Sequence, residues 1–279
     1  LRRVKKLGVS RLASLPARED PEIAAASRLM QTVFAITHFH KPELFPLFVF
    51  RRFEQCLEHG NDTYAGQTYI GLSMILAGLG EVELAQRLGE MSLALPSTPA
   101  GDKLRCRSLF VFYSFVVPWI RPVRESLQAL AATAQTAIEN GDLEYFGYAV
   151  TMRGLGLLYT SSSLAELTAE FEGTLSQLTA LGQERCVLIQ SIMCEAAHEL
   201  RHGAPSGALV GPFYQNREGL ARCKDPMDHT LVFHHYLAEL CVAAHLGDLA
   251  NATRAVELAQ PFLDHGAFGS YLLSPFLFY

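Results

Sequence analysis

One pattern occurs twice in the chain: residues 69–90 read YIGLSMILAGLGEVELAQRLGE, and residues 236–257 read YLAELCVAAHLGDLANATRAVE. Each copy has a glycine before an acidic residue (Gly80, Gly247) and an alanine five positions after that glycine (Ala85, Ala252). The two glycines lie 167 residues apart, close to five periods of about 34 residues, a period typical of helical repeats. The alternative is two unrelated amphipathic helices that share a common turn.

The same turn signal recurs at Gly60-Asn61 and Gly141-Asp142. Glycine commonly ends a helix, and an acid or amide caps the next one. Apolar residues between these turns recur at spacings of three and four, and no period-2 strand pattern competes. We predict helices over 21–38, 42–59, 62–79, 82–95, 102–117, 121–140, 142–160, 163–181, 183–202, 227–246 and 248–264.

These pairs predict an all-α fold, specifically a right-handed superhelix (α-solenoid) of tetratricopeptide-like (TPR-like) helix pairs. A single pair cannot bury its apolar face alone, so neighbouring pairs must stack. Residues 1–20 are predicted to be a basic linker, and residues 21–279 the solenoid. The solenoid is either one continuous domain or two lobes that meet near 203–226, where glycine and proline are frequent.

Composition excludes several classes of protein. Of the 279 residues, 49% are hydrophobic, which excludes disorder, and a net charge of -5 argues against a nucleic-acid partner. The low-charge stretches 63–80 and 108–120 are too polar or too short for a membrane span of about 20 residues. Six cysteines without a CxxC motif indicate a reducing, cytoplasmic location. The apolar C-terminal end suggests a piece excised from a longer protein.

The sharpest local motif is His198-Glu199-Leu200-Arg201-His202, an HExxH sequence. On a helix, HExxH places two imidazoles on one face, beside a carboxylate that can activate zinc-bound water. Here both histidines fall away from the predicted apolar stripe, and the extended HxxGxxH continuation is absent. We therefore interpret the motif as a solvated helix face, with a zinc hydrolase as the remote alternative, and predict no metal site.

Arg153 is the candidate binding residue, because it is the only charge between Glu144 and Glu166. A buried guanidinium needs a carboxylate or an anionic ligand beside it. The two interpretations are an ion pair with an adjacent helix and contact with a ligand or peptide carboxylate. The remaining histidine groups, His38 with His40 and His229 with His234-His235, are predicted to pack against neighbouring helices.

Nearly the whole chain resembles the helical region of large multisensor signalling kinases. The likeness is carried by diffuse helix-packing motifs, namely Leu15-Pro16 with Asp20-Pro21, Arg28-Leu29-Met30, 42–47 (PELFPL), Gly60-Asn61 with Tyr64-Ala65 and Tyr69, 119–122 (WIRP), 141–149 (GDLEYFGYA) and Leu164-Ala165-Glu166. In that family a Ser/Thr-kinase-like domain and an AAA/STAND-type ATPase precede the helices, and GAF and histidine-kinase domains follow them.

The resemblance implies a regulatory helical module that couples a ligand or partner to such output domains and has no catalysis or cofactor of its own. The chain is consistent with this, because it has no GxxxxGK[ST] loop, no HRD and no DFG motif. The implied partners are a protein or peptide, or flanking ATPase and kinase domains of the same chain. A small-molecule receptor domain of a STAND-type regulator is the alternative.

Overall fold

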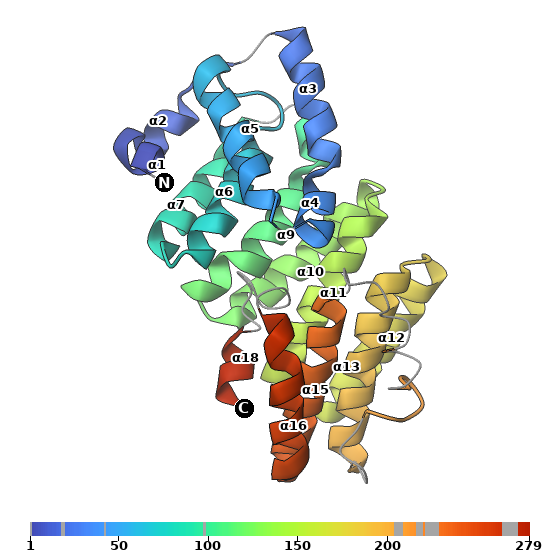
Figure 1. The fold of residues 1–279 in the computed structure, drawn as a ribbon. Helices are drawn as coiled ribbons and strands as arrows, with labels where there is room; N and C mark the ends of the chain where they lie inside the picture. The colour runs from blue at the N-terminus through green and yellow to red at the C-terminus, as the bar shows by residue number, and fades with distance from the viewer. Residues whose placement is uncertain are drawn as a thin grey trace. The chain divides into compact units, whose positions relative to one another are not determined.

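The computed structural model describes residues 2–17, 20–41, 43–96, 99–203, 209–215, 220, 229–263 and 273–279. These residues form α-helices, short 3₁₀ turns and two isolated β-bridges, and they include no β-strand (Figure 1). The predicted all-α class is therefore confirmed. Contacts between residues divide the chain into two compact units, Leu1–Pro122 (unit 1) and Val123–Tyr279 (unit 2).

The sequence predicts that two lobes, if present, meet near 203–226. The division by contacts falls instead between Pro122 and Val123. Of the stretch 203–226, residues 204–208, 216–219 and 221–226 lie outside the described residues.

Unit 1 is built around the helix hairpin of α6 and α7, against which α5, α9 and the short α2 pack. Its elements are α1 (Arg2–Leu7), α2 (Val9–Ala13), α3 (Pro21–Thr32), α4 (Phe34–His40), α5 (Phe45–His59), α6 (Ala65–Gly78), α7 (Val82–Ala94), α8 (Pro99–Lys103), α9 (Arg105–Phe115) and the 3₁₀ turn η1 (Val117–Trp119).

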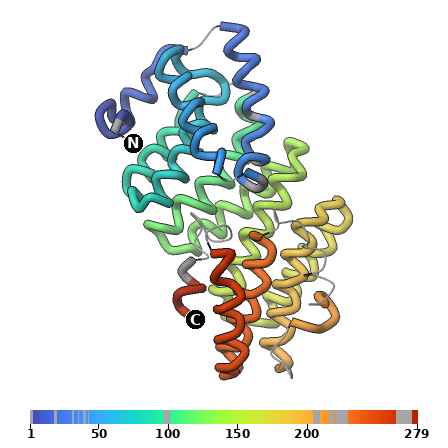
Figure 2. Tube along the Cα trace, in the orientation of Figure 1, coloured from blue at the N-terminus to red at the C-terminus, as the bar shows by residue number. Residues whose placement is uncertain are grey.

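Unit 2 consists mainly of three successive hairpins, which Figure 2 traces as a tube. Its elements are α10 (Val123–Glu139), α11 (Leu143–Thr160), α12 (Leu164–Ala180), α13 (Glu184–His202), α15 (His229–Leu246), α16 (Leu249–Ala259), η3 (Gln260–Phe262) and α18 (Leu273–Phe278). Helix α13 packs against α11, α12 and α15, so neighbouring hairpins share one apolar core.

One turn geometry closes the four hairpins formed by α6–α7, α10–α11, α12–α13 and α15–α16 in the described part of the chain, and the glycine signals predict three of these turns. The glycine adopts φ between 66° and 79°, a left-handed conformation that other residues rarely adopt. Its N–H donates to the carbonyl three residues earlier, and the next N–H donates to the carbonyl five residues earlier, which is the Schellman pattern. The four glycines are Gly80, Gly141, Gly182 and Gly247.

The N-terminal segment differs from the predicted linker, because it contains α1 and α2. Val4 and Leu12 are fully buried, and α2 packs against α7. Over the described residues of α1 and α2, only these two apolar side chains are buried, among five basic residues, so the hydrophobic pattern is too short to predict a helix from the sequence. The predicted helix over 21–38 is also interrupted, at Val33 between α3 and α4.

The two low-charge stretches form buried helices. Residues 63–80 contain α6, whose side chains are buried on nearly every face, and residues 108–120 contain most of α9. No helix among the described residues is both long enough and apolar enough to cross a bilayer.

Candidate functional site

Arg153 projects from α11 and pairs with a carboxylate of the adjacent helix, as one of the two interpretations predicts. Its Nη1 donates to Oε1 of Glu170 on α12. Partial burial lowers the pKa of the Arg153 guanidinium from its ordinary value. The two side chains remain 30% and 36% exposed, and such a solvated ion pair contributes only about 0–1 kcal/mol. An incoming carboxylate can therefore replace Glu170 at little energetic loss.

Arg153 also lines a groove of about 470 Å³ between α10 and α11. A second guanidinium stands in the same groove: Arg124 donates from Nη2 to the carbonyl oxygen of Thr160, 3.0 Å away. The rest of the lining is neutral and partly apolar, comprising Leu127, Gln128, Ala131, Leu157 and Thr160. The groove thus presents two cations beside aliphatic side chains. We call it the arginine groove.

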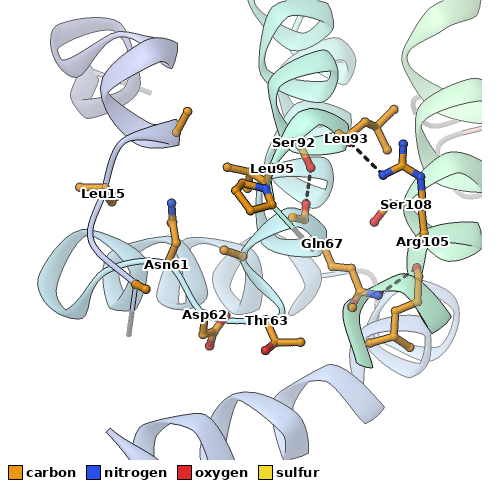
Figure 3. Close-up of a pocket in the computed structure, with 17 residues that line it drawn as sticks. Leu15, Asn61, Asp62, Thr63, Gln67, Ser92, Leu93, Leu95, Arg105 and Ser108 are labelled. Carbon is orange, nitrogen blue, oxygen red and sulfur yellow. Dashed lines mark hydrogen bonds between the residues drawn. The ribbon is translucent and has the colours of Figure 1, made fainter. Parts of the chain in front are cut away.

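Unit 1 contains a separate cavity of about 340 Å³ (Figure 3). Its walls come from four separated segments: the end of α2 with the residues after it, the turn between α5 and α6 with the start of α6, the end of α7 with the residues after it, and the segment from α8 to the start of α9. Gly60 positions one wall, since a Cβ at its φ of 93° would overlap the carbonyl of Pro16. Asn61 then donates two hydrogen bonds across that junction, from its N–H to Pro16 O at 2.8 Å and from its Nδ2 to Leu12 O at 2.9 Å.

Polar groups converge on this cavity, which we call the Gln67 cavity. The Gln67 side chain lies on its inner side, donates from Nε2 to Leu104 O at 3.3 Å, and is only 6% exposed (Figure 3). Its Oε1 accepts no hydrogen bond from the described residues. Arg105 stands across from it and donates from Nη1 to Leu93 O at 3.0 Å (Figure 3). The hydroxyl of Ser92 donates to Gly66 O at 2.6 Å.

The HExxH motif lies in the last two turns of α13. The rings of His198 and His202 are 4.3 Å apart, and His202 is exposed, as predicted. Glu199 instead points into the core, where burial and then the nearby Glu195 raise the pKa of its carboxyl. Across the part of the chain that the structure describes, no group of three or more His, Cys, Asp or Glu side chains is placed to hold a metal ion.

Sequence reasoning missed a fully buried carboxylate, that of Glu195 on α13. Its Oε2 accepts hydrogen bonds from the backbone N–H groups of Phe213 (2.8 Å) and Tyr214 (3.0 Å), which fastens the segment 209–215 to the helix. Gly211 packs against the carboxylate so closely that a Cβ would overlap Oε1. The available signal was that Glu195 is the only acidic residue in 186–198.

A second set of interacting polar side chains is centred on α15. His235 is buried, with its Nε2 lying 3.3 Å from Oε1 of Glu239, and Oε2 of Glu239 lies 3.2 Å from Nη2 of Arg254 on α16. The ring of Tyr214 lies 5.5 Å from that of His235. Of these contacts, only the one between Glu239 and Arg254, whose side chain is 44% exposed, joins α15 to α16.

The other predicted histidine groups pack against neighbouring helices where they are described. His38 lies against the rings of Phe45 and Phe115, at 5.2 and 5.7 Å. His229 lies 5.3 Å from Phe262, and His234 is buried. The side chain of His40 lies outside the described residues.

The described cysteines, Cys56, Cys106, Cys186, Cys194 and Cys241, are buried thiols. Burial raises the pKa of Cys186 to about 11, of Cys194 to about 12 and of Cys241 to about 11. A nucleophilic cysteine needs the thiolate. These three therefore stay protonated near neutral pH and serve as core residues.

Comparison of the chain with protein-family models, with curated proteins and with solved structures found no match. The resemblance to multisensor kinases therefore stays a prediction, and function must be inferred from the residues and their geometry. We take two concave sites among the described residues as candidates: the arginine groove in unit 2 and the Gln67 cavity in unit 1.

Proposed function

We propose that this chain is a non-catalytic helical-repeat regulatory module that binds an acidic segment of a protein partner, or of a flanking ATPase or kinase domain, in the arginine groove. The carrying observation is that Arg124 and Arg153 stand in one groove beside aliphatic side chains. Two guanidiniums favour carboxylates, and the leucines provide an apolar floor for the partner.

Exchange of carboxylates provides the binding step. In the unbound chain, Arg153 is paired with Glu170, and each side chain is about one-third exposed. A partner carboxylate that takes its place is shielded from water by the bound segment, so its attraction to the guanidinium is stronger than that of Glu170. Occupation of the groove thereby breaks the contact between Arg153 on α11 and Glu170 on α12, which shifts the packing equilibrium of these two helices by at most about 1 kcal/mol.

Two observations support the proposed architecture and family of the chain. Packing of α11, α13 and α15 across successive hairpins supports continued stacking into a right-handed superhelix of TPR-like pairs. The quoted motifs support membership of a cytoplasmic multisensor signalling kinase, in which the module links an ATPase switch to a kinase output.

Photo-crosslinking tests the proposed partner site. We replace Gln128, which is exposed and lines the groove, with a photoreactive amino acid in the cell of origin, and use Gln135 on the same helix outside the groove as the control position. We expect a discrete crosslinked product from position 128 that disappears when Arg124→Gln and Arg153→Gln are added. Products that are equal from both positions, or unchanged by the arginine substitutions, would overturn the proposal.

A second role, a small-molecule receptor, is supported by a different observation. The Gln67 cavity holds a buried amide with an unused acceptor. Its ligand is considered next.

A further inference from the structure

We infer that the Gln67 cavity binds a small organic carboxylate that carries an N–H or O–H donor next to the carboxylate, the chemistry of 2-amino and 2-hydroxy acids. The inference rests on the receptor role and is independent of the arginine groove, which lies in the other unit. Three features of the lining specify the ligand: a cationic side, a buried acceptor and apolar walls.

The cationic side consists of Arg105 and the first turn of α6. Arg105 uses one nitrogen on Leu93 O, and a guanidinium has further N–H donors to offer a carboxylate. The first amide N–H groups of a helix have no intrahelical partner, and the N-cap residue of α6, Tyr64, supplies no side-chain cap. Residues 65–67 of that turn line the cavity. The N–H of Ala65 already donates to the carbonyl oxygen of Asp62 at 3.0 Å, so Gly66 and Gln67 provide the N–H groups for a ligand. The positive end of the helix and Arg105 therefore both favour an anion.

Asp62, the one acidic residue among the described lining residues, does not cancel this preference. Asp62 is buried against Arg52, whose Nη2 lies 3.5 Å from Oδ1, and Oδ1 also accepts the Tyr64 N–H at 2.9 Å. Its charge is thus balanced by Arg52, which is itself buried. The net charge presented to a ligand comes from Arg105.

The buried acceptor is Oε1 of Gln67. A buried oxygen without a donor destabilises the unliganded chain by about 1–3 kcal/mol, and a donor supplied by the ligand removes that penalty. The terminal torsion of glutamine is broad, so the amide can turn and present the oxygen to the cavity, which weakens the hydrogen bond from Nε2 to Leu104 O. A carboxylate alone cannot use this group, because it has no hydrogen to donate; an adjacent amine or hydroxyl can.

Leucines line the remaining walls, namely Leu15, Leu93, Leu95 and Leu104. They favour an apolar side chain on the ligand. The volume of about 340 Å³ lies at the lower end of ligand sites. A phosphate ligand fits less well, because the lining residues that the structure describes include a single cationic side chain, Arg105.

Isothermal titration calorimetry of the whole chain tests the inference, with the proteinogenic amino acids, their 2-hydroxy analogues, L-leucinamide and inorganic phosphate as probes. We expect at least one amino or hydroxy acid with an apolar side chain to bind with Kd below about 1 mM. Arg105→Met should weaken that binding about ten-fold or more, because it removes a charge-assisted hydrogen bond. Gln67→Leu should weaken it as well.

Lys103→Met is the matched control, since this exposed lysine lies two residues from Arg105 and outside the lining. Its binding should equal that of the wild type. The inference is overturned if no acid binds below about 1 mM, if L-leucinamide or phosphate binds as tightly as the best acid, or if Arg105→Met binds normally. Arg105 is exposed, so its variant is expected to fold, which circular dichroism checks.

Discussion

The same substitution, glycine to alanine, should change stability in opposite directions at two positions of unit 2. Gly141 ends α10 with φ of 72°, and Gly173 lies in the interior of α12. A Cβ at either position meets no atom within 4 Å, so packing contributes to neither result. Only the backbone conformation distinguishes them.

The magnitudes follow from that conformation. At Gly141 the left-handed strain of an L-residue is roughly 1–2 kcal/mol, and restriction of the unfolded chain returns roughly 0.4–1 kcal/mol. We therefore expect Gly141→Ala to lower the free energy of unfolding by about 0.5–1 kcal/mol. At Gly173 the backbone is helical, so Gly173→Ala should raise the free energy of unfolding by roughly 0.5–1 kcal/mol.

Urea denaturation followed by circular dichroism measures both changes in the same unfolding transition, because both residues belong to unit 2. The urea concentration at the unfolding midpoint should fall for Gly141→Ala and rise for Gly173→Ala, each by about 0.2–0.5 M from the wild-type value. The dependence of the unfolding free energy on urea concentration should not change. If both variants shift in the same direction, or Gly141→Ala is stabilising, then the Schellman turn does not close the α10–α11 hairpin.

Three further predictions concern unit 2. Glu195→Ala should lower the free energy of unfolding by about 2–4 kcal/mol, because the N–H groups of Phe213 and Tyr214 lose their acceptor. Glu195→Gln keeps an acceptor and should lower the free energy of unfolding by less, and urea denaturation compares the two variants. Burial, with a smaller contribution from Arg185, lowers the pKa of His234 from 6.5 to about 3. The unfolded chain then binds a proton that the folded chain does not, so stability should fall by about 2 kcal/mol from pH 7 to pH 5, and His234→Gln should abolish that part of the fall. Protein purified without chelators should contain less than stoichiometric zinc, and His198→Ala should leave the metal content unchanged, as elemental analysis can measure.

Each of these predictions has a contradicting result. Equal stability of the two Glu195 variants would mean that the hydrogen bonds to segment 209–215 are not made in solution. A pH dependence identical in the wild type and His234→Gln would show that this imidazole is not buried neutral. Stoichiometric zinc that His198→Ala loses would restore the hydrolase alternative.

The hairpins were predictable from the sequence because their signals are local. Gly141-Asp142 is an example: the glycine takes up the left-handed turn, and the aspartate accepts a hydrogen bond from Tyr145 N–H at 3.4 Å. Such a signal needs only neighbouring residues. The limits of the helices on either side accordingly agree with the predicted ranges to within one or two residues.

The candidate sites were predictable only in part. Arg153 was identifiable because no other charged residue lies near it in the sequence, and a partly buried guanidinium needs a partner. Nothing in the local sequence, however, identifies Glu170 as that partner, because it lies 17 residues later. Glu195 was missed because helical periodicity predicts one buried face, whereas α13 packs against three helices. The Gln67 cavity joins four separated segments, so only tertiary structure reveals it.

The affinity of the chain for the crosslinked partner tests the central claim most directly. Titration of the purified partner against the wild type and the Arg124→Gln, Arg153→Gln double variant should give binding at least ten-fold weaker for the variant, since each lost charge-assisted hydrogen bond contributes about 1.5–3 kcal/mol. The wild-type affinity should also fall more steeply with salt. Equal affinities and equal salt dependence would contradict recognition through the arginine groove.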